Sequence, residues 1–255
     1  MKINYRNKYS QVADLYDLYT NTDFDINFWI KECSKDKEVL ELACGTGRIT
    51  IRLAKAGIKV TAIDISREFI KKLKAKCKKE KLGINIHEAD MRSFSLKKKF
   101  PLIIIPFQSI QELVDPKDHE ATFTHVYNHL DDKGRFIVTT HNTDIVDKKA
   151  LGVIKLITEF VNPRTKNKMR FLMSRSFNTK THIGTAHQVY EEYDKNNRLI
   201  SKKLFKNSHY VFEDREIEAL AKKTGFNVRK IYGDYSHSKL TKKSPFRIYE
   251  FVKKV

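Results

Sequence analysis

The stretch VLELACGTGR, residues 39–48, is an apolar strand that leads into a turn containing Gly45 and Gly47. Glycine carries no side chain, so the backbone amides of this turn can approach a ligand closely. The turn opens a predicted helix, and the next predicted strand ends on Asp64, close to the offset of ~20 residues that is typical of a ribose-binding carboxylate. The segment therefore predicts an α/β fold with a site for a nucleoside-containing cofactor at this turn.

Residues that are missing near this turn narrow the choice of cofactor. A dinucleotide site carries the pattern GxGxxG, in which the third glycine permits close helix–strand packing and the helix N-terminus faces a pyrophosphate. Here the third position is Thr50, and the sequence contains no GxxxxGK[ST] phosphate loop. A pyrophosphate-containing cofactor is therefore the poorer interpretation.

Outward from this turn, short apolar runs typical of buried strands alternate with segments of helical spacing. We predict helices at 9–19, 24–33, 48–56, 66–81, 117–130 and 214–224, and strands at 39–42, 59–63, 85–87, 102–106, 135–140, 226–232 and 246–252. A turn at 131–134 is expected to precede the strand at 135–140. The order βαβαβ implies a doubly wound, mostly parallel sheet of seven strands.

Residues 153–212 lose helical character. Three segments, 169–177, 185–193 and 199–210, alternate and are rich in aromatic and β-branched residues, and 194–197 has the composition of a hairpin turn. We interpret this region as an inserted antiparallel β lid that covers the substrate. The core domain would then consist of residues 1–152 and 213–255.

The composition limits the class of protein. Hydrophobic residues make up 40% of the 255 residues, enough for a core of substantial size. No apolar run approaches the ~20 residues of a membrane span, and the N-terminus lacks a signal-peptide pattern, so we expect a cytoplasmic protein without a membrane partner. Cys33, Cys44 and Cys77 are scattered and form no CxxC pair. We therefore expect neither a disulfide framework nor a metal site.

The net charge of +19 leaves two interpretations open. A basic surface suits a polyanion such as RNA. Lysine greatly outnumbers arginine, however, and nucleic-acid readers favour arginine because its planar fork pairs with phosphate and guanine. Much of the excess lies in 71–81 and 97–99. We favour solvated helix and loop faces over a binding groove for these runs.

Four ordered motifs identify a family. The sequence resembles the class I S-adenosylmethionine-dependent methyltransferases over about residues 5–142 and, weakly, over the C-terminal strands. The motifs are VLELACGTGRIT (39–50), VTAIDIS (60–66), EADMRSF (88–94) and FPLIIIPFQSI (100–110). The resemblance implies S-adenosylmethionine as the cofactor.

The resemblance also implies roles for individual residues. Glu41, Ala43, Gly45 and Gly47 would surround the methionine part of the cofactor, and Asp64, followed by Ile65, would hold both ribose hydroxyls. Asp90 and the Met91 backbone would read the adenine edge, the Phe107 carbonyl would lie near the amino group, and Tyr9 and Tyr16 would contact the cofactor from the N-terminal segment.

Each polar residue of this set also has a structural interpretation. Asp64 could cap the next helix, although Ser66 already fits that position. Glu41 could be a tolerated buried acid, although such burial is costly without a partner. Asp90 could be an ordinary loop acid. Cys44 has no basic neighbour to lower its pKa, so we expect it to be a small packing residue.

Two further segments of the sequence bear on the identity of the methyl acceptor. YSQVADLYDLY (9–19) and PFQSIQEL (106–113) resemble small-molecule N-methyltransferases, including those that act on amino sugars. In that subgroup Tyr9 would cover the cofactor and a histidine would follow the fourth strand, where this sequence has Glu112. Glu112 could hold or deprotonate an ammonium, or it could be a surface acid. His141, at the end of the fifth strand, is either a further catalytic candidate or a structural residue.

Three functional hypotheses remain at this point. The first is methyl transfer to a small-molecule acceptor, an amine in the favoured version, in an enzyme that could form a homodimer through its lid. The second is an RNA methyltransferase that uses the basic surface, although the motif [DNS]PP[YF] is absent. The third is a cofactor-binding module without turnover. The catalytic candidates of the first hypothesis are Tyr9, Glu112 and His141.

Overall fold

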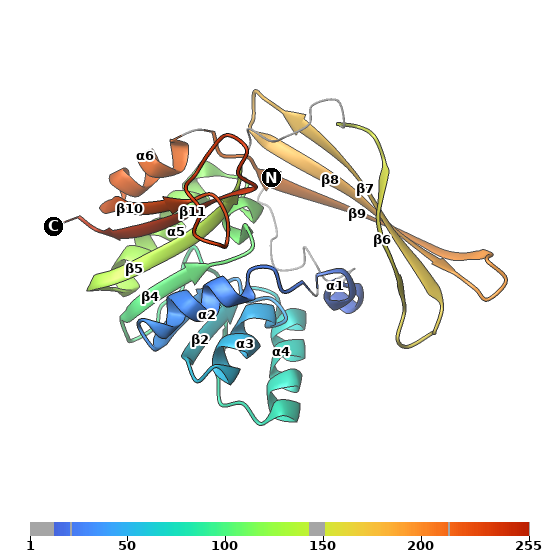
Figure 1. Cartoon of the computed structure of the whole chain (residues 1–255), viewed down its shortest axis with the longest axis horizontal. Helices are drawn as coiled ribbons and strands as arrows, with labels where there is room; N and C mark the ends of the chain where they lie inside the picture. Colours follow the sequence, from blue (N-terminus) through green and yellow to red (C-terminus); the bar gives the residue numbers. More distant parts are fainter. Residues whose placement is uncertain (1–12, 21, 143–150, 214, 255) are drawn as a thin grey trace.

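The computed structural model describes residues 13–20, 22–142, 151–213 and 215–254, which form a seven-stranded and a four-stranded sheet with flanking helices (Figure 1). The helices are α1 (Ala13–Tyr19), α2 (Ile26–Ser34), α3 (Arg48–Lys55), α4 (Arg67–Glu80), the short 3-10 helix η3 (Ser109–Glu112), α5 (Pro116–His129) and α6 (Glu216–Lys223). The strands are β1 (Glu38–Leu42), β2 (Lys59–Asp64), β3 (Asn85–Glu88), β4 (Phe100–Ile105), β5 (Leu130–His141), β6 (Lys155–Val161), β7 (Lys168–Asn178), β8 (Ile183–Tyr193), β9 (Leu199–Tyr210), β10 (Phe226–Tyr232) and β11 (Phe246–Lys253).

The large sheet has the strand order β10-β11-β5-β4-β1-β2-β3. Strands β1 to β5 are parallel, whereas β11 pairs antiparallel with both β5 and β10. The chain winds outward from β1 in one direction through β2 and β3, and in the other through β4 and β5. The predicted doubly wound, mostly parallel sheet of seven strands is thus confirmed.

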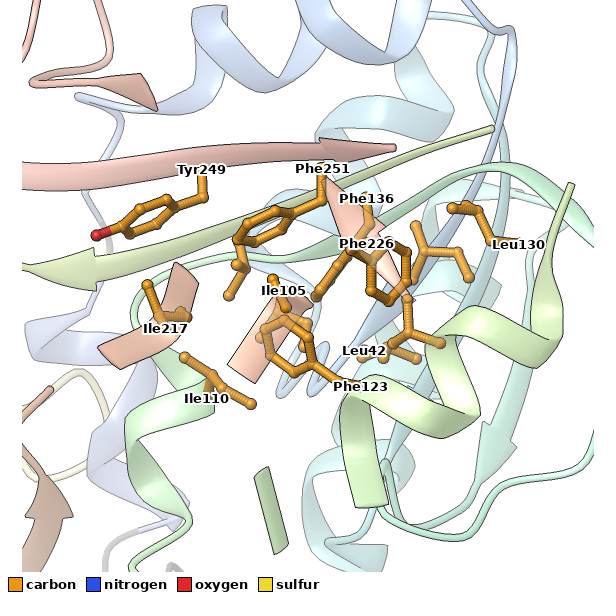
Figure 2. Packing of buried hydrophobic residues seen from close by; sticks show 14 of the residues in the cluster. Leu42, Ile105, Ile110, Phe123, Leu130, Phe136, Ile217, Phe226, Tyr249 and Phe251 are labelled. Atoms are coloured by element: carbon orange, nitrogen blue, oxygen red, sulfur yellow. The ribbon is translucent and has the colours of Figure 1, made fainter. Parts of the chain in front are cut away.

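The two faces of this sheet form separate apolar layers. One layer joins the sheet to α2, α3 and α4 and includes Trp29, Leu53 and Leu73. The other joins it to α5 and α6, where Phe123 and Phe226 pack among the aromatic residues of β5 and β11 (Figure 2). Because successive side chains of a strand point to opposite faces, a strand with both faces covered is apolar throughout. This explains the uninterrupted apolar run of β4.

Side-chain caps set the N-terminal bounds of α4 and α5. The Ser66 hydroxyl accepts a hydrogen bond from the Phe69 backbone N–H at 3.3 Å, so Ser66 is the N-cap of α4, as predicted. Asp115 caps α5 in the same way through the Lys117 N–H, and Pro116 occupies the first helical position.

The small sheet, β6-β7-β8-β9, is antiparallel throughout and lies between β5 and α6 in the chain. It extends away from the large sheet (Figure 1). The hairpin turn predicted at 194–197 is present, with a hydrogen bond from the Asn197 N–H to the Asp194 carbonyl. One face packs on α1 through Leu15, which contacts a cluster containing Phe171 and Tyr190.

Two local predictions were wrong. Strand β6 was not anticipated, because its apolar residues do not alternate: a register shift separates Leu156 from Thr158. The predicted turn at 131–134 does not end before the strand, since β5 already begins at Leu130. There the ladder with β4 shifts register, and the four residues of turn composition are accommodated within the strand.

No helix within the described ranges is long and apolar enough to cross a lipid bilayer.

A buried arginine links three elements of the core domain. Arg135 on β5 donates to Glu32 Oε2 of α2 at 2.8 Å and to Glu250 Oε2 of β11 at 2.9 Å, and it also pairs with Asp36. Both glutamates are almost fully buried. Removing one partner from such a group leaves charge in a medium that solvates it poorly.

We therefore expect Arg135→Met to lower the free energy of unfolding by about 3–5 kcal/mol, because Glu32 and Glu250 each lose their most buried cationic partner. Urea denaturation measures this change. Arg229→Met is a matched control, since the half-exposed Arg229 side chain also pairs with Glu250 and should contribute less than about 1 kcal/mol. Equal stability of the two variants would contradict this assignment.

Candidate functional site

The carboxyl ends of the parallel strands meet at one edge of the large sheet. Residues 43–47 follow β1, Asp64 ends β2, 89–91 follow β3, 106–108 follow β4, and His141 ends β5. In open α/β sheets, ligands bind at this edge, where the strand order reverses. In this chain the reversal lies between β1 and β4.

The turn after β1 contains two glycines with different roles. Both lie in the left-handed region, Gly45 at φ 57° and Gly47 at φ 91°. A Cβ atom on Gly47 would lie 2.2 Å from Leu73 Cδ1 of α4, so this glycine is required for packing. A Cβ atom on Gly45 would meet nothing within 4 Å. Gly45 therefore leaves open space on the ligand side of the turn.

A cavity opens between the ends of β1 and β4. It combines the turn after β1, the residues after β4 and one residue of α1. Its lining consists of Tyr16, Glu41, Ala43, Cys44, Gly45, Thr46, Arg48, Ile49, Pro106, Phe107 and Ser109. The cavity has a volume of about 40 Å³, and the Arg48 guanidinium lies over the Phe107 ring in its wall, 4.5 Å from the ring centre.

Glu41 forms part of the cavity wall and is 2% exposed. Its Oε2 accepts a hydrogen bond from the Thr50 hydroxyl at 2.6 Å. Burial raises the Glu41 pKa to about 8, although the bond from Thr50 opposes the shift. Thr50 occupies the position of the third glycine of a dinucleotide motif. In this protein its hydroxyl donates a hydrogen bond to Glu41.

Asp64 joins the turn after β1 to the start of α4. Its Oδ2 accepts from the Gly45 N–H and its Oδ1 from the Ser66 N–H, both at 2.8 Å. Burial raises the Asp64 pKa to about 6, while these two bonds favour the ionised form. A carboxylate oxygen has two lone pairs, so each can accept one more donor. That capacity matches the two hydroxyls of a ribose.

Asp90 is close to this edge but is engaged elsewhere. Its carboxylate accepts from the Arg92 backbone N–H and pairs with the Arg92 guanidinium, which also contacts Asp118. Ile65 and Met91, the neighbours of the two acids, are partly buried against the apolar layer of α5 and α6. These residues therefore line the edge next to Asp64 rather than the cavity itself.

The exit from β4 has an unusual backbone. Phe107 and Gln108 both lie in the left-handed region, at φ 55° and 58°. Residues other than glycine rarely adopt this backbone conformation, and such strain concentrates at functional sites. It is held by hydrogen bonds from the Gln108 N–H to the Thr139 hydroxyl at 2.9 Å and from Gln108 Nε2 to the Tyr235 hydroxyl at 3.3 Å.

Glu112 and His141 lie in one corner, where the small sheet approaches the strand ends. Glu112 Oε1 accepts from Asn207 Nδ2 of β9 at 3.1 Å. His141 is exposed, yet desolvation by the surrounding protein and the neighbouring basic side chains of His209 and Arg175 lower its pKa to about 4, against the opposing effect of Glu112. The imidazole is therefore neutral at pH 7.

The remaining predicted contacts come from the N-terminal segment. Tyr16 lines the cavity, and its ring packs on Phe69 with the ring centres 4.8 Å apart. Tyr9 lies outside the described residues.

Sequence reasoning missed two residues of this region. Arg48 lines the cavity and is anchored by Asp25 of the loop before α2, with Nη2 and Oδ2 2.8 Å apart. Gln111 of η3 contacts both His141 and the end of β9. Only the position of Arg48 directly after the glycine turn could have drawn attention to it. Neither pairing leaves a sequence pattern, because the partners are distant in the chain.

Across the described ranges, no group of three or more His, Cys, Asp or Glu side chains is arranged to hold a metal ion.

Comparisons with known proteins point to one family. A family model described as a methyltransferase domain matches residues 39–134. Candidate methyltransferase YqeM of Bacillus subtilis is 32% identical over 139 residues, which are 53% of this chain and 56% of that protein. The dTDP-3-amino-3,6-dideoxy-alpha-D-glucopyranose N,N-dimethyltransferase of Streptomyces fradiae is 26% identical over 137 residues, 50% of this chain and 52% of the relative. The chain thus spans about half the length of these curated relatives.

A solved structure matches the whole fold. The CcbJ methyltransferase of Streptomyces caelestis superimposes with a TM-score of 0.86 over 99% of this chain and 100% of its own, at 16% sequence identity. This likeness covers both sheets, whereas the family model covers only the first part of the large sheet and its helices. Residues 39–134 thus match a methyltransferase domain, and the fold of the chain is similar to that of solved S-adenosylmethionine-dependent methyltransferases.

Proposed function

We propose that this protein transfers the methyl group of S-adenosylmethionine to the amine of a small-molecule acceptor. One observation carries the proposal: Glu112 and His141 lie close to one another where the small sheet contacts the strand ends of the large sheet. The similarity to an amino-sugar N,N-dimethyltransferase supports an amine as the acceptor.

The residues at the carboxyl ends of β1, β2 and β4 offer groups that are chemically suited to S-adenosylmethionine. Asp64 has two acceptor positions for the ribose hydroxyls, and the open space at Gly45 admits a ligand next to the backbone. Glu41 offers a carboxyl to the methionine ammonium. Bound there, S-adenosylmethionine supplies an electrophilic methyl group. Arg48 and Phe107 line the cavity that a nucleoside would enter.

The other predicted contacts complete the proposed cofactor site. Asp90 and the Met91 backbone would face the adenine beside Ile65, and the Phe107 carbonyl would face the amino group. Ala43 and Gly47 shape the turn, and Tyr9 and Tyr16 would cover the cofactor from α1 and the segment before it. For Asp90 to contact adenine, its carboxylate must share the bonds that it now makes with Arg92.

Glu112 and His141 can have separate roles toward an amine acceptor, one in binding and one in proton transfer. An amine attacks only as the neutral species, and a nearby carboxylate attracts its protonated form. Glu112 would hold the incoming ammonium, while the neutral His141 can accept its proton. Residues 153–212, which contain β6 to β9, would act as the lid that encloses this reaction.

The small sheet supports one further part of the proposal, a homodimer formed through the lid. Several large apolar side chains of this sheet are exposed, and such patches often mark protein–protein contacts. They are Leu156, Ile157, Val161, Leu199, Ile200 and Leu204.

The basic run at 97–99 gives little support to RNA as the acceptor. Lys98 pairs with Glu38, and Lys99 Nζ lies 3.6 Å from Asp132 Oδ1. These partners neutralise part of the charge that a phosphate backbone would need.

We expect Asp64→Ala to weaken S-adenosylmethionine binding about 10- to 150-fold, which corresponds to the roughly 1.5–3 kcal/mol of hydrogen bonds to a charged group. Calorimetric titration measures the affinity, and a thermal melt verifies that the variant is folded. Asp132→Ala removes an exposed acid at the opposite edge of the sheet and should bind normally. Unchanged affinity in Asp64→Ala would overturn the ribose assignment.

Cofactor binding at pH 7 should release close to one proton from Glu41. With a pKa of about 8 this acid is mostly protonated, and a bound ammonium favours the carboxylate. Titration calorimetry in buffers of different ionisation enthalpy counts the protons. In Glu41→Gln the observed enthalpy should no longer depend on the buffer. Wild-type protein that shows no buffer dependence would place the ammonium elsewhere.

Methyl transfer itself is tested by a mass-spectrometric screen of small amines, amino sugars and RNA for added methyl groups. On the substrate found, Glu112→Gln should retain cofactor affinity and lower turnover by about ten- to ten-thousandfold. Charge reversal at Lys97, Lys98 and Lys99 is the matched control and should leave turnover and its salt dependence unchanged. Methylation of RNA that collapses with salt and with the lysine variant would refute the small-molecule assignment.

A further inference from the structure

The Gln111 side chain contacts three groups from two other elements. Gln111 lies in η3 and is 2% exposed. Its Oε1 lies 2.8 Å from the His141 backbone nitrogen and 3.0 Å from His141 Nδ1, and its Nε2 lies 2.8 Å from the carbonyl oxygen of Tyr210. One buried amide therefore connects the end of β5 with the end of β9.

Two backbone groups fix the orientation of this amide. The Tyr210 carbonyl can only accept, so it faces the Gln111 NH₂ group, and the His141 N–H can only donate, so it faces Oε1. A flipped amide would place two acceptors together at one end and two donors together at the other. Buried contacts of that kind cost about 1–3 kcal/mol for each group left unsatisfied.

The orientation of the amide determines the tautomer of His141. Oε1 of Gln111 has no hydrogen to donate, so the contact with Nδ1 exists only when Nδ1 carries the proton. In a neutral imidazole the other nitrogen, Nε2, then holds the lone pair. Gln111 thus leaves Nε2 as the only nitrogen of the ring that can accept a proton.

The surroundings of the ring keep it neutral. The charged and titratable groups that act on it are His209 on β9, Arg175 on β7 and Glu112 on η3, and Phe246 of β11 lies beside it with the ring centres 6.4 Å apart. His209 and Arg175 disfavour protonation of the His141 ring, and the carboxylate of Glu112 only partly offsets their effect.

We infer that Gln111 is a positioning residue that holds His141 as the Nδ1–H tautomer, so that Nε2 takes the proton from the acceptor amine. The inference rests on the proposed function. In the step, the lone pair of the amine nitrogen forms the new N–C bond, the C–S bond breaks with its electron pair left on sulfur, and the proton on nitrogen moves to Nε2. Imidazolium then returns the proton to solvent.

The contact with Tyr210 gives Gln111 a second role in the same arrangement. Tyr210 is the last residue of β9, the strand by which the small sheet returns to the core domain. One of the two backbone bonds that orient the amide is therefore made by the small sheet, and the other is made by His141 at the end of the large sheet. The contact between β9 and η3 and the tautomer of His141 therefore both depend on the Gln111 side chain.

The tautomer can be read without any substrate. In protein labelled with ¹⁵N-histidine, the shifts of Nδ1 and Nε2 distinguish the protonated from the unprotonated nitrogen, and His141→Asn identifies the resonances. We expect a single Nδ1–H form in the wild type at pH 7 and a mixture of tautomers in Gln111→Met, which keeps the volume but removes the acceptor. A wild-type ring protonated at Nε2, or a tautomer that Gln111→Met leaves unchanged, would overturn the inference.

Gln111→Glu separates orientation from structural support. A carboxylate still accepts from Nδ1–H, so the tautomer should persist, while its charge raises the His141 pKa and moves the acidic limb of the pH–rate profile upward. Gln111→Met should lower kcat by about ten- to a hundredfold and leave cofactor affinity unchanged. A pH–rate profile of Gln111→Glu that matches the wild type would contradict the inference.

These results also separate this inference from the proposed function. Failure to methylate any amine, combined with the expected tautomers, would refute the choice of acceptor but not the role of Gln111. Methylation of an amine, combined with a tautomer that is insensitive to Gln111, would refute the role of Gln111 alone.

Discussion

The hydrogen bonds of the buried Asp64 carboxylate are the interactions on which the proposed cofactor site at the strand ends depends. The carboxylate accepts one backbone N–H from the turn after β1 and one from the start of α4, so a single anion holds together two loops that leave neighbouring parallel strands. The Ala89 N–H bonds to the Asp64 carbonyl and adds the end of β3. Three strand ends are thus registered around one residue. A buried acid is costly, and here the backbone donors of the fold offset that cost.

The two sheets contribute different parts of the candidate site. The large sheet supplies rigid strand ends, with Glu41 and Asp64 in fixed positions. The small sheet supplies Asn207 and the carbonyl of Tyr210, which reach Glu112 and Gln111. The proposed cofactor contacts therefore lie in regular elements near the start of the chain, whereas the proposed acceptor site combines segments that are distant in the sequence.

This division explains which features could be predicted from the sequence. The strands at 199–210 and 226–232, the cap at Ser66 and the acid at the end of β2 follow from local patterns of apolar, turn and capping residues. Strand β6 escaped prediction because a bulge interrupts its alternation. The bonds from Gln111 to His141 and Tyr210 join residues 30 and 99 positions apart, and no periodicity records such contacts.

The described part of helix α1, Ala13–Tyr19, lies between the two sheets of the structure and α4. Its successive residues face three different bodies: Leu15 packs on the small sheet, Tyr16 lines the cavity beside the cofactor turn, and Asp17 pairs with Lys76 of α4. These tertiary contacts connect the helix to the small sheet, to the cavity wall and to α4. Fraying of α1 would uncover the cavity wall and the inner face of the small sheet in the same event. In terms of local stability, these two surfaces belong to one cooperative unit, and their amide protons should exchange with solvent together.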